Sequence, residues 1–427
     1  MLLIRNGRVL DPASRTDASL DVLLDGDRIA QVGANLPAPG GAEIFDASGL
    51  IVAPGFIDLH CHLREPGQEL SETIETGTRS AAQGGFTAVC CMPNTQPVND
   101  RASVTRGIVE RAATVGAVRV WPIGAVSQGS KGEALAEIAA MKDAGIVAVS
   151  DDGKPVSTAR LMRQAMEYCD PLGLPVIEHA EDPSLAAGGV MREGPHSLRL
   201  GLKGIPSQSE SICVGRDAEL AGLTGARLHI AHMSTTRSLE YVRAAKKQGL
   251  RVTCEVTPHH FTLIDEDVRY DTNFKMNPPL ASREDREALI SGLADGSIDA
   301  IATDHAPHHP ASKDVEFDRA PFGILGFEMA LALALRELVQ KNKISLMRLV
   351  ELFTTGPARV LGIERKVASG EPADVTIFST EHKWTYRVSE SPSKSRNSPF
   401  DGAEFTGAPM ATIVGGRMAY RRNGPSR

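Results

Sequence analysis

Short apolar runs alternate with longer amphipathic stretches along most of the chain. The runs are typical of buried parallel strands, and the stretches between them have the period of helices that pack on such strands. Repeated strand-helix units predict a parallel sheet flanked by helices, and eight of them predict a (β/α)8 barrel with its active site at the carboxyl ends of the strands. The eight runs lie at residues 55–60, 86–92, 118–126, 146–152, 175–180, 227–233, 250–258 and 298–305.

Amphipathic stretches predict the helices that cover this barrel. Glycine and proline residues near their ends mark where a helix begins or stops. The expected helices lie within residues 71–85, 133–145, 158–173, 218–226, 236–249, 328–342 and 346–362.

The two ends of the chain have a different pattern, with short β-rich runs separated by Asn-Gly, Asp-Gly and Ser-Gly turn signals. Residues 1–54 predict a small antiparallel module, and the strand-like run at 370–379 predicts that residues 366–427 complete it. We therefore expect an α/β chain with a catalytic barrel at 55–365 and a small β-sandwich-like domain built from both termini. The Ser- and Pro-rich segment 389–402 is expected, from its composition, to be a surface loop.

Composition narrows the class of protein. The chain has 427 residues, of which 42% are hydrophobic, and a formal net charge of -7. A nucleic-acid binder carries a basic excess that neutralises phosphates, so this charge favours a small-molecule substrate over nucleic acid. No apolar run approaches the roughly 20 residues of a membrane helix, and Arg5 comes too early for a signal peptide. The six cysteines are scattered without paired spacing, so we expect reduced thiols, no membrane association and a soluble, cytoplasmic protein.

Side chains that commonly bind metals stand at the ends of five of the predicted strands. His60 and His62 are two residues apart in a strand, so both face the same side and can direct ring nitrogens at one ion. Of the adjacent Asp151 and Asp152, only one can face inward. The candidate ligands are His60, His62, one of Asp151 and Asp152, His179, His232 and Asp304.

The size of this set predicts two metal ions. A catalytic zinc ion commonly takes three protein ligands and keeps one position open, so six ligands fit two ions that share a bridging carboxylate. Imidazole and carboxylate ligands favour zinc, with two ions per subunit, although manganese or cobalt suits the same ligands. His229 and His232 are three residues apart and should face opposite sides of their strand while both remain in strand geometry; His232 is nearer the strand end and is the better ligand.

A centre of this kind predicts hydrolysis of an amide-like bond, because such ions acidify water and polarise the carbonyl under attack. Asp304 is the candidate for carrying the proton from the attacking water to the departing nitrogen. Arg64 follows the histidine pair closely and, as a cation, does not bind a metal ion. Its planar guanidinium suits a substrate carboxylate, and the alternative is a structural salt bridge at the barrel rim.

Eight short motifs occur in one order along essentially the whole chain: DLHCHLREPG, MPNT, SDDG, EHAED, AHMS, KMNPPL, ATDHAPH and APFGILGFE. Together they resemble class I dihydroorotases of the amidohydrolase superfamily. The resemblance implies a metal-dependent, reversible cyclisation of N-carbamoyl-L-aspartate to L-dihydroorotate, in de novo pyrimidine synthesis.

The resemblance also implies a role for each matching position. The metal-binding positions are matched by His60 and His62 for the first ion, Asp152 as the bridge, His179 and His232 for the second ion, and Asp304 as a ligand of the first ion and the general acid/base. The substrate positions are matched by Arg64, Asn94 and His308 beside the carboxylate, and by Asn277, Phe322 and Gly323 beside the pyrimidine ring. Without the resemblance, Asn94 and Asn277 would be interpreted as capping or turn residues next to proline.

The segment between His305 and Pro321 resembles a mobile loop over the active site, and its polar composition with few apolar anchors agrees. The resemblance gives no role to three other histidines, which we expect to be surface or packing residues: His196, His309 and His382.

Two other functions stay open. Hydantoinases and allantoinases of the same superfamily typically bridge their metals with a carboxylated lysine on the fourth strand, where this chain has Asp151 and Asp152, while Lys154 lies beyond the strand. A non-catalytic homologue would serve as a structural partner of aspartate transcarbamoylase, but such a chain is expected to lose metal ligands, and every ligand position is filled here. By family analogy we expect a homo-oligomer, a dimer, and a complex with aspartate transcarbamoylase is a further option.

Overall fold

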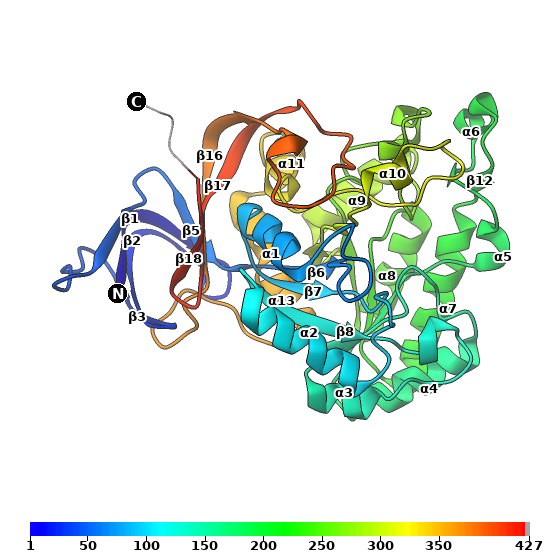
Figure 1. Cartoon of the computed structure of the whole chain (residues 1–427), viewed down its shortest axis with the longest axis horizontal. Helices are drawn as coiled ribbons and strands as arrows, with labels where there is room; N and C mark the ends of the chain where they lie inside the picture. Colours follow the sequence, from blue (N-terminus) through cyan, green and yellow to red (C-terminus); the bar gives the residue numbers. More distant parts are fainter. Residues whose placement is uncertain (423–427) are drawn as a thin grey trace.

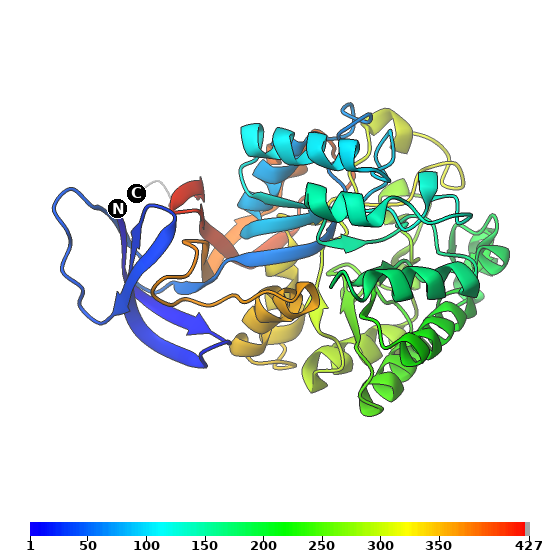
Figure 2. The same cartoon turned by 90° about the horizontal axis from the view of Figure 1, so that it is seen from below.

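The eight apolar runs form eight parallel strands, as predicted, and each pairs with the strand of the next run. A bridge between Cys61 and His305 joins the two ends of this sheet, so it closes nearly into a barrel with the helices outside (Figures 1 and 2). The structure is a computed structural model that describes residues 1–422. The barrel strands are β6 (Phe56–Cys61), β7 (Phe86–Cys91), β8 (Arg119–Gly124), β9 (Ala148–Val149), β10 (Val176–Glu178), β13 (Leu228–Ile230), β14 (Val252–Val256) and β15 (Ala300–Ile301).

The helices agree with the predicted stretches in most places. The prediction lacks the helices α2 (Ala102–Val115) and α9 (Arg283–Asp295) and the short helices α5 (Pro183–Ala186), α6 (Pro195–Leu200) and α10 (Pro310–Lys313). The single helix predicted at 346–362 is wrong. It breaks at Thr354, whose backbone angles (φ -126°, ψ -84°) are not helical, and Pro357 has no N–H to continue the ladder. The main helices are α1 (Ile74–Gln83), α2 (Ala102–Val115), α3 (Ile138–Ala144), α4 (Ala159–Cys169), α7 (Gln208–Thr224), α8 (Thr236–Lys247), α9 (Arg283–Asp295), α11 (Ala330–Ala334), α12 (Leu346–Phe353) and α13 (Thr355–Leu361).

Strands from both ends of the chain form one further sheet, on the left in Figures 1 and 2. Its two halves meet where β16 pairs antiparallel with β5, so the C-terminal strands complete the N-terminal module as predicted. The pairing is mixed rather than wholly antiparallel, because β4 and β5 both lie parallel to β1. The strands are β1 (Leu2–Asp11), β2 (Thr16–Asp25), β3 (Arg28–Gly33), β4 (Glu43–Asp46), β5 (Ile51–Pro54), β16 (Val375–Thr385), β17 (Glu404–Val414) and β18 (Arg417–Arg421). The exact domain boundaries stay a prediction.

This sheet is fixed to the amino ends of the barrel strands by buried polar contacts. Asp374 accepts hydrogen bonds from Arg119 (2.7 Å) and Arg365 (2.7 Å). Thr376 accepts from the N–H of Phe56, at the start of β6, and donates to the carbonyl of Gly85, just before β7. The opposite, carboxyl ends of the strands are therefore left free to form a site.

The prediction of a surface loop at 389–402 is wrong for the middle of that segment. Ser393, Ser395 and Asn397 are buried, because each polar side chain has a protein partner that replaces water. Ser393 donates to the buried carboxylate of Glu72, and Ser395 donates to the carbonyl of Ser71 at 2.7 Å. Composition alone does not reveal such partners, which lie more than 300 positions away in the chain.

Within residues 1–422, none of the helices combines the length and the apolar character needed to span a membrane.

Candidate metal centre and substrate pocket

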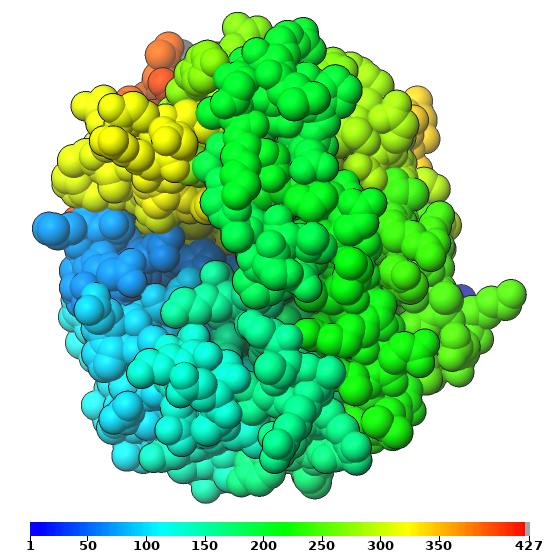
Figure 3. Space-filling view, turned by 90° about the vertical axis from the view of Figure 1, so that its right-hand side faces the viewer, coloured from blue at the N-terminus to red at the C-terminus, as the bar shows by residue number. Residues whose placement is uncertain are grey.

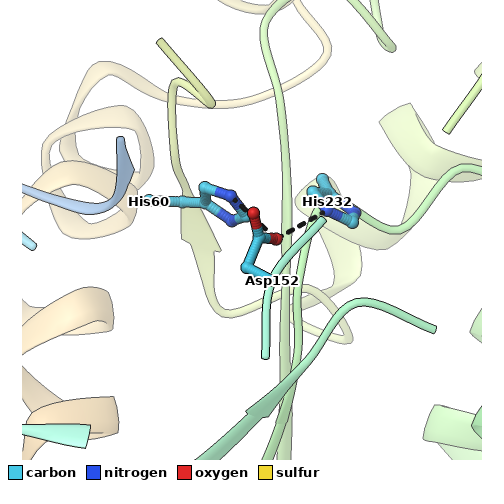
Figure 4. A group of neighbouring side chains, drawn as sticks. All are labelled: His60, Asp152 and His232. Atoms are coloured by element: carbon cyan, nitrogen blue, oxygen red, sulfur yellow. Dashed lines mark ion pairs between the residues drawn. The ribbon is translucent and has the colours of Figure 1, made fainter. Parts of the chain in front are cut away.

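Asp152 lies at the centre of a group of imidazoles at the carboxyl end of the barrel. Its Oδ1 atom is 3.2 Å from His60 Nε2 and 3.6 Å from His232 Nε2, so that the carboxylate stands between the two rings (Figure 4). His179 Nδ1 approaches the same oxygen at 3.6 Å. Three strand ends, β6, β10 and β13, thus bring ring nitrogens to one carboxylate that follows β9.

Asp304 forms the second carboxylate of the group. Its Oδ1 atom lies 3.1 Å from His62 Nε2 and 3.5 Å from His60 Nε2. Burial opposes ionisation of Asp304, but the neighbouring His60 and His62 outweigh it and hold the pKa of this carboxyl below its ordinary value. All six ligands predicted from the strand ends are therefore side by side. Two triads among them have ligand atoms close enough to hold an ion: His60, Asp152, His232, and His60, His62, Asp304.

Unpaired buried atoms test whether a metal fits. His60 Nε2 and Asp152 Oδ1 are buried, and neither has a hydrogen-bond partner among residues 1–422. Leaving such atoms unpaired costs about 1 to 3 kcal/mol each, and more for a charged group. The two atoms lie 3.2 Å apart. A cation bound beside them would be coordinated by imidazole and carboxylate, the donors that zinc and similar ions prefer. The donor set fits a metal cofactor.

Glu255 holds the centre from beneath, a role that the strand-end pattern missed. Its Oε1 lies 3.2 Å from His60 Nδ1, the ring nitrogen that faces away from Asp152, and its Oε2 lies 3.1 Å from His229 Nε2. Burial opposes ionisation, but hydrogen bonds with His229 and His60 lower the pKa of Glu255 to about 2. A carboxylate on the far nitrogen orients a ligating imidazole and raises its basicity. The available signal was an ionisable residue inside the apolar run of β14.

Asp151 and Asp152 face different ways, which confirms that only one of them can join the centre. The N–H of Ser127 donates to Asp151 Oδ1 at 3.0 Å, and the Ser127 hydroxyl contacts the other oxygen. Asp151 therefore anchors a neighbouring loop, whereas Asp152 is the residue beside the histidines.

The backbone is strained where several of these side chains turn into the site. Arg64 (φ 61°), His232 (φ 30°) and Asp304 (φ 45°) adopt left-handed conformations that side chains other than glycine rarely take. His232 has thus left strand geometry, and its N–H reaches Glu255 Oε1 at 3.4 Å while His229 reaches Oε2. The alternation of side chains along a strand therefore does not extend to His232. The His229 side chain contacts Glu255, and the His232 side chain lines the cavity.

A cavity of about 320 Å³ opens beside the centre. Viewed from the end of the molecule away from the terminal sheet, a hollow is visible where blue, yellow and green segments meet (Figure 3). His60 is fully buried beneath the cavity. The other predicted site residues all line it: His62, Arg64, Asn94, Asp152, His179, His232, Asn277, Asp304, His308, Phe322 and Gly323.

Arg64 supplies a buried positive charge to this cavity. Its Nε donates to the carbonyl of Pro307 at 3.0 Å, and Nη2 lies 3.4 Å from His308 Nε2. Burial lowers the pKa of Arg64 to about 10, which leaves it charged at neutral pH. No carboxylate of residues 1–422 forms an ion pair with it, so the alternative of a rim salt bridge receives no support.

Two asparagines connect the cavity wall to the histidines. Asn94 Oδ1 lies 3.0 Å from His62 Nδ1. Asn277 Nδ2 donates to Glu181 at 2.9 Å and lies 3.2 Å from His179 Nε2, and its Oδ1 is buried without a partner. Both contacts place these side chains at the site rather than in a local cap or turn.

Comparison with known proteins adds the decisive observation. A family model described as "Dihydro-orotase-like" matches residues 49–238. The dihydroorotase of Solibacter usitatus (strain Ellin6076) is 58% identical over 423 residues, which cover 99% of this chain and 98% of the relative. The dihydroorotase of Geobacter metallireducens is 51% identical and covers 99% and 100%.

The chain belongs to the dihydroorotase family.

Solved structures of hydantoinases and dihydropyrimidinases share the fold of this chain. L-hydantoinase from Arthrobacter aurescens aligns with a TM-score of 0.88 and 25% identity over 99% of this chain and 96% of that one. Dihydropyrimidinase from Brevibacillus agri NCHU1002 aligns with a TM-score of 0.86 and 24% identity, covering 98% and 95%. The much higher identity to dihydroorotases decides the family. Lys154, the lysine nearest the fourth strand, is exposed and lies outside the centre, so it does not take the position of a metal-bridging lysine.

The 305–321 segment is better anchored than its composition predicts. Phe317 is buried, and so is Lys313, whose ammonium donates to the carbonyls of Thr272 (3.0 Å) and Pro321 (2.8 Å). Burial, and secondarily the nearby charge of Lys275, lowers the pKa of Lys313 to about 7. Phe317 is thus an apolar anchor and Lys313 a polar one, and mobility of the loop stays a prediction.

Several histidines lie outside the metal centre and the cavity. His309 caps the short helix α10 (Pro310–Lys313), and His196 Nε2 lies 2.9 Å from the carbonyl of Val268, both packing or surface roles. The half-buried His382 also lies outside the cavity. His260 is buried, and its Nε2 lies 2.9 Å from the carbonyl of Pro278, next to Asn277.

Proposed function

We propose that this protein acts as a dihydroorotase that interconverts L-dihydroorotate and N-carbamoyl-L-aspartate in pyrimidine synthesis, with two zinc ions per subunit. The observation that carries the proposal is the position of the Asp152 carboxylate among histidine nitrogens, next to a cavity that contains the unpaired cation of Arg64. A metal centre can promote hydrolysis of a cyclic amide. A buried arginine favours a substrate that bears a carboxylate.

The residues would divide the two ions between them. We assign His60, His62 and Asp304 to the first ion, His179 and His232 to the second, and Asp152 to both. Bound there, the ions acidify the attacking water and polarise the ring carbonyl. The absence of cysteine from this donor set favours zinc, and manganese or cobalt are the alternatives that metal analysis distinguishes.

Asp304 is assigned the proton transfer. Its carboxylate lines the cavity and lies beside the His62 imidazole. In hydrolysis it accepts a proton from the attacking water and donates that proton to the ring nitrogen as the C–N bond breaks. In cyclisation it takes the proton from the carbamoyl nitrogen and returns it to the departing water.

Substrate recognition is assigned to the remaining lining residues. Arg64, Asn94 and His308 would hold the carboxylate, which the guanidinium can bind through two parallel hydrogen bonds. Asn277, Phe322 and Gly323 would line the side of the pyrimidine ring, where the unpartnered Oδ1 of Asn277 can accept from a ring N–H.

We further propose a cytoplasmic homodimer, with a domain division at residues 54/55 and 365/366, and association with aspartate transcarbamoylase as an option. These assignments follow family analogy and the pattern of the chain. Size measurement of the purified protein, alone and mixed with the transcarbamoylase, tests the two assemblies.

A parallel assay tests the proposed reaction. The purified protein is analysed for metal per chain and then supplied separately with L-dihydroorotate, hydantoin and allantoin. We expect turnover of L-dihydroorotate alone. Cleavage of hydantoin or allantoin without turnover of L-dihydroorotate would overturn the assignment of the substrate.

A further inference from the structure

The buried part of the 389–402 segment lies against the wall of the substrate cavity. In Figure 1 this segment, between β16 and β17, extends from the terminal sheet over the barrel toward the loop that carries α10. Asn397 is 3% exposed and is the residue of this segment that contacts the cavity wall most directly. It belongs to no motif that predicted the site.

Asn397 uses its whole side-chain amide on backbone groups of the cavity wall. Its Nδ2 donates to the carbonyls of Ala306 (2.9 Å) and Gly323 (3.0 Å), and its Oδ1 accepts from the N–H of His308 (3.1 Å). The orientation of the amide is fixed by these partners, because carbonyls only accept and an N–H only donates. Its own carbonyl accepts from the N–H of Leu325 at 2.9 Å.

The amide thereby joins two chain segments that both line the cavity. Ala306 and His308 belong to the segment after β15, while Gly323 belongs to the segment after Phe322. His308 Nε2 lies 2.7 Å from the carbonyl of Phe322, so the same two segments also meet through the imidazole. They are close: a Cβ on Gly323, whose φ is 124°, would stand 2.6 Å from Ala306 Cβ.

The segment that carries Asn397 is itself held in place. Glu72 is buried and accepts from the Ser393 hydroxyl and from the N–H of Lys394 (3.2 Å), and it lies 3.5 Å from His305 Nε2. The N–H of His62 donates to the carbonyl of His305 at 2.8 Å. Asn397 therefore projects from a rigid support and can set the spacing of the two segments that it joins.

We propose that Asn397 is a positioning residue for substrate recognition. It fixes the backbone of His308 relative to Phe322 and Gly323, so that the imidazole meets the substrate carboxylate at the same time as Arg64. The inference rests on the proposed role of His308 in binding that carboxylate. Asn397 lies behind the residues that line the cavity, and its side chain hydrogen-bonds to backbone groups rather than to Asp304, so its loss should weaken binding rather than chemistry.

Two variants test this role. Asn397→Ala removes all three side-chain hydrogen bonds, and we expect KM for L-dihydroorotate to rise roughly tenfold while kcat changes less than about twofold. Asn397→Asp has nearly the same size and keeps an oxygen that can accept from the N–H of His308, but it turns a carboxylate oxygen toward two carbonyls, so KM should rise at least as much. An unchanged KM in a folded Asn397→Asp enzyme would overturn the proposal.

A matched control separates positioning from stability. Thr376→Val also removes two buried side-chain hydrogen bonds to backbone groups, but at the amino ends of the barrel strands. We expect it to lower Tm without changing KM. If Thr376→Val raised KM as much as Asn397→Ala at the same loss of Tm, the effect at Asn397 would be one of general stability and the proposal would be wrong.

The variant His308→Ala distinguishes this inference from the function on which it rests. If His308→Ala leaves KM unchanged, the proposed contact with the carboxylate fails. If His308→Ala raises KM and the Asn397 variants do not, only the positioning role fails. If Asn397 acts through His308, the double variant His308→Ala/Asn397→Ala should have the KM of His308→Ala alone, whereas multiplied effects would contradict that route.

Discussion

Two buried aspartates lie at opposite ends of the barrel strands and are surrounded in different ways. Asp374, at the amino ends, accepts hydrogen bonds from Arg119, Arg365 and the N–H of Gly415. Asp152, at the carboxyl ends, has three histidine nitrogens near its Oδ1, and within residues 1–422 that atom has no hydrogen-bond partner. Both are almost fully buried.

The difference lies in the source of the positive charge beside each buried carboxylate. Burial opposes ionisation of both carboxylates; the arginines hold the pKa of Asp374 below its ordinary value, and His60 with the other histidines does so for Asp152. Arginine is always charged, so the chain itself neutralises Asp374. Histidine is neutral when it binds a metal, so Asp152 needs an added cation. The amino end is thus complete as protein, and the carboxyl end is complete only with its cofactor.

Asp304→Asn should have the largest effect and confine it to the carboxyl end. An amide does not accept the proton of the attacking water, and we expect kcat to fall by about a thousandfold, or about 4 kcal/mol. Steady-state assays with L-dihydroorotate measure the loss, and thermal unfolding checks that the fold is retained. Full activity in this variant would remove Asp304 from the acid/base role.

Asp374→Ala should have the next largest effect and confine it to the amino end. It leaves Arg365 buried without its carboxylate, and breaking such a pair costs about 3 kcal/mol of unfolding free energy. Denaturant unfolding measures the loss. The kcat/KM per folded molecule should be unchanged; a fall in kcat/KM comparable to that of Asp304→Asn would show that the two ends are not independent.

Arg64→Met should have a smaller effect, on binding. The variant keeps the length of the side chain and loses the charge, so KM for L-dihydroorotate should rise about thirtyfold, or about 2 kcal/mol, with a smaller change in kcat. Comparison with Asn397→Ala, which keeps the charge, sharpens the distinction between a group that binds the substrate and one that positions its neighbours. An unchanged KM would remove Arg64 from the carboxylate site.

Local patterns in the sequence were enough to predict the barrel and to select side chains that the structure brings together at the carboxyl ends of its strands. Apolar runs mark parallel strands because both faces of these strands are buried. A polar residue at the end of such a run is expected at the carboxyl end of the barrel, where active sites form. For this reason His60, His62 and Asp304 were identifiable one strand at a time.

Features that depend on distant partners were not predictable in this way. Glu255 lies inside an apolar run, and only its contact with His60, almost 200 positions away, reveals its role. The serines and Asn397 of the 389–402 segment have a loop-like composition, yet they are buried because Glu72 and the cavity wall offer hydrogen bonds. His232 leaves strand geometry, so alternation along β13 no longer applies to it.

The most direct test of the account is a metal titration of the apoenzyme. Protein stripped with a chelator is assayed for L-dihydroorotate turnover and Tm as zinc is added, with Asp152→Asn as the matched variant. We predict an inactive apoenzyme of lower Tm, recovery of both properties that is complete at two ions per chain, and weaker binding in Asp152→Asn. Full turnover by metal-free protein, or an Asp152→Asn variant that binds zinc and turns over substrate like the parent, would contradict it.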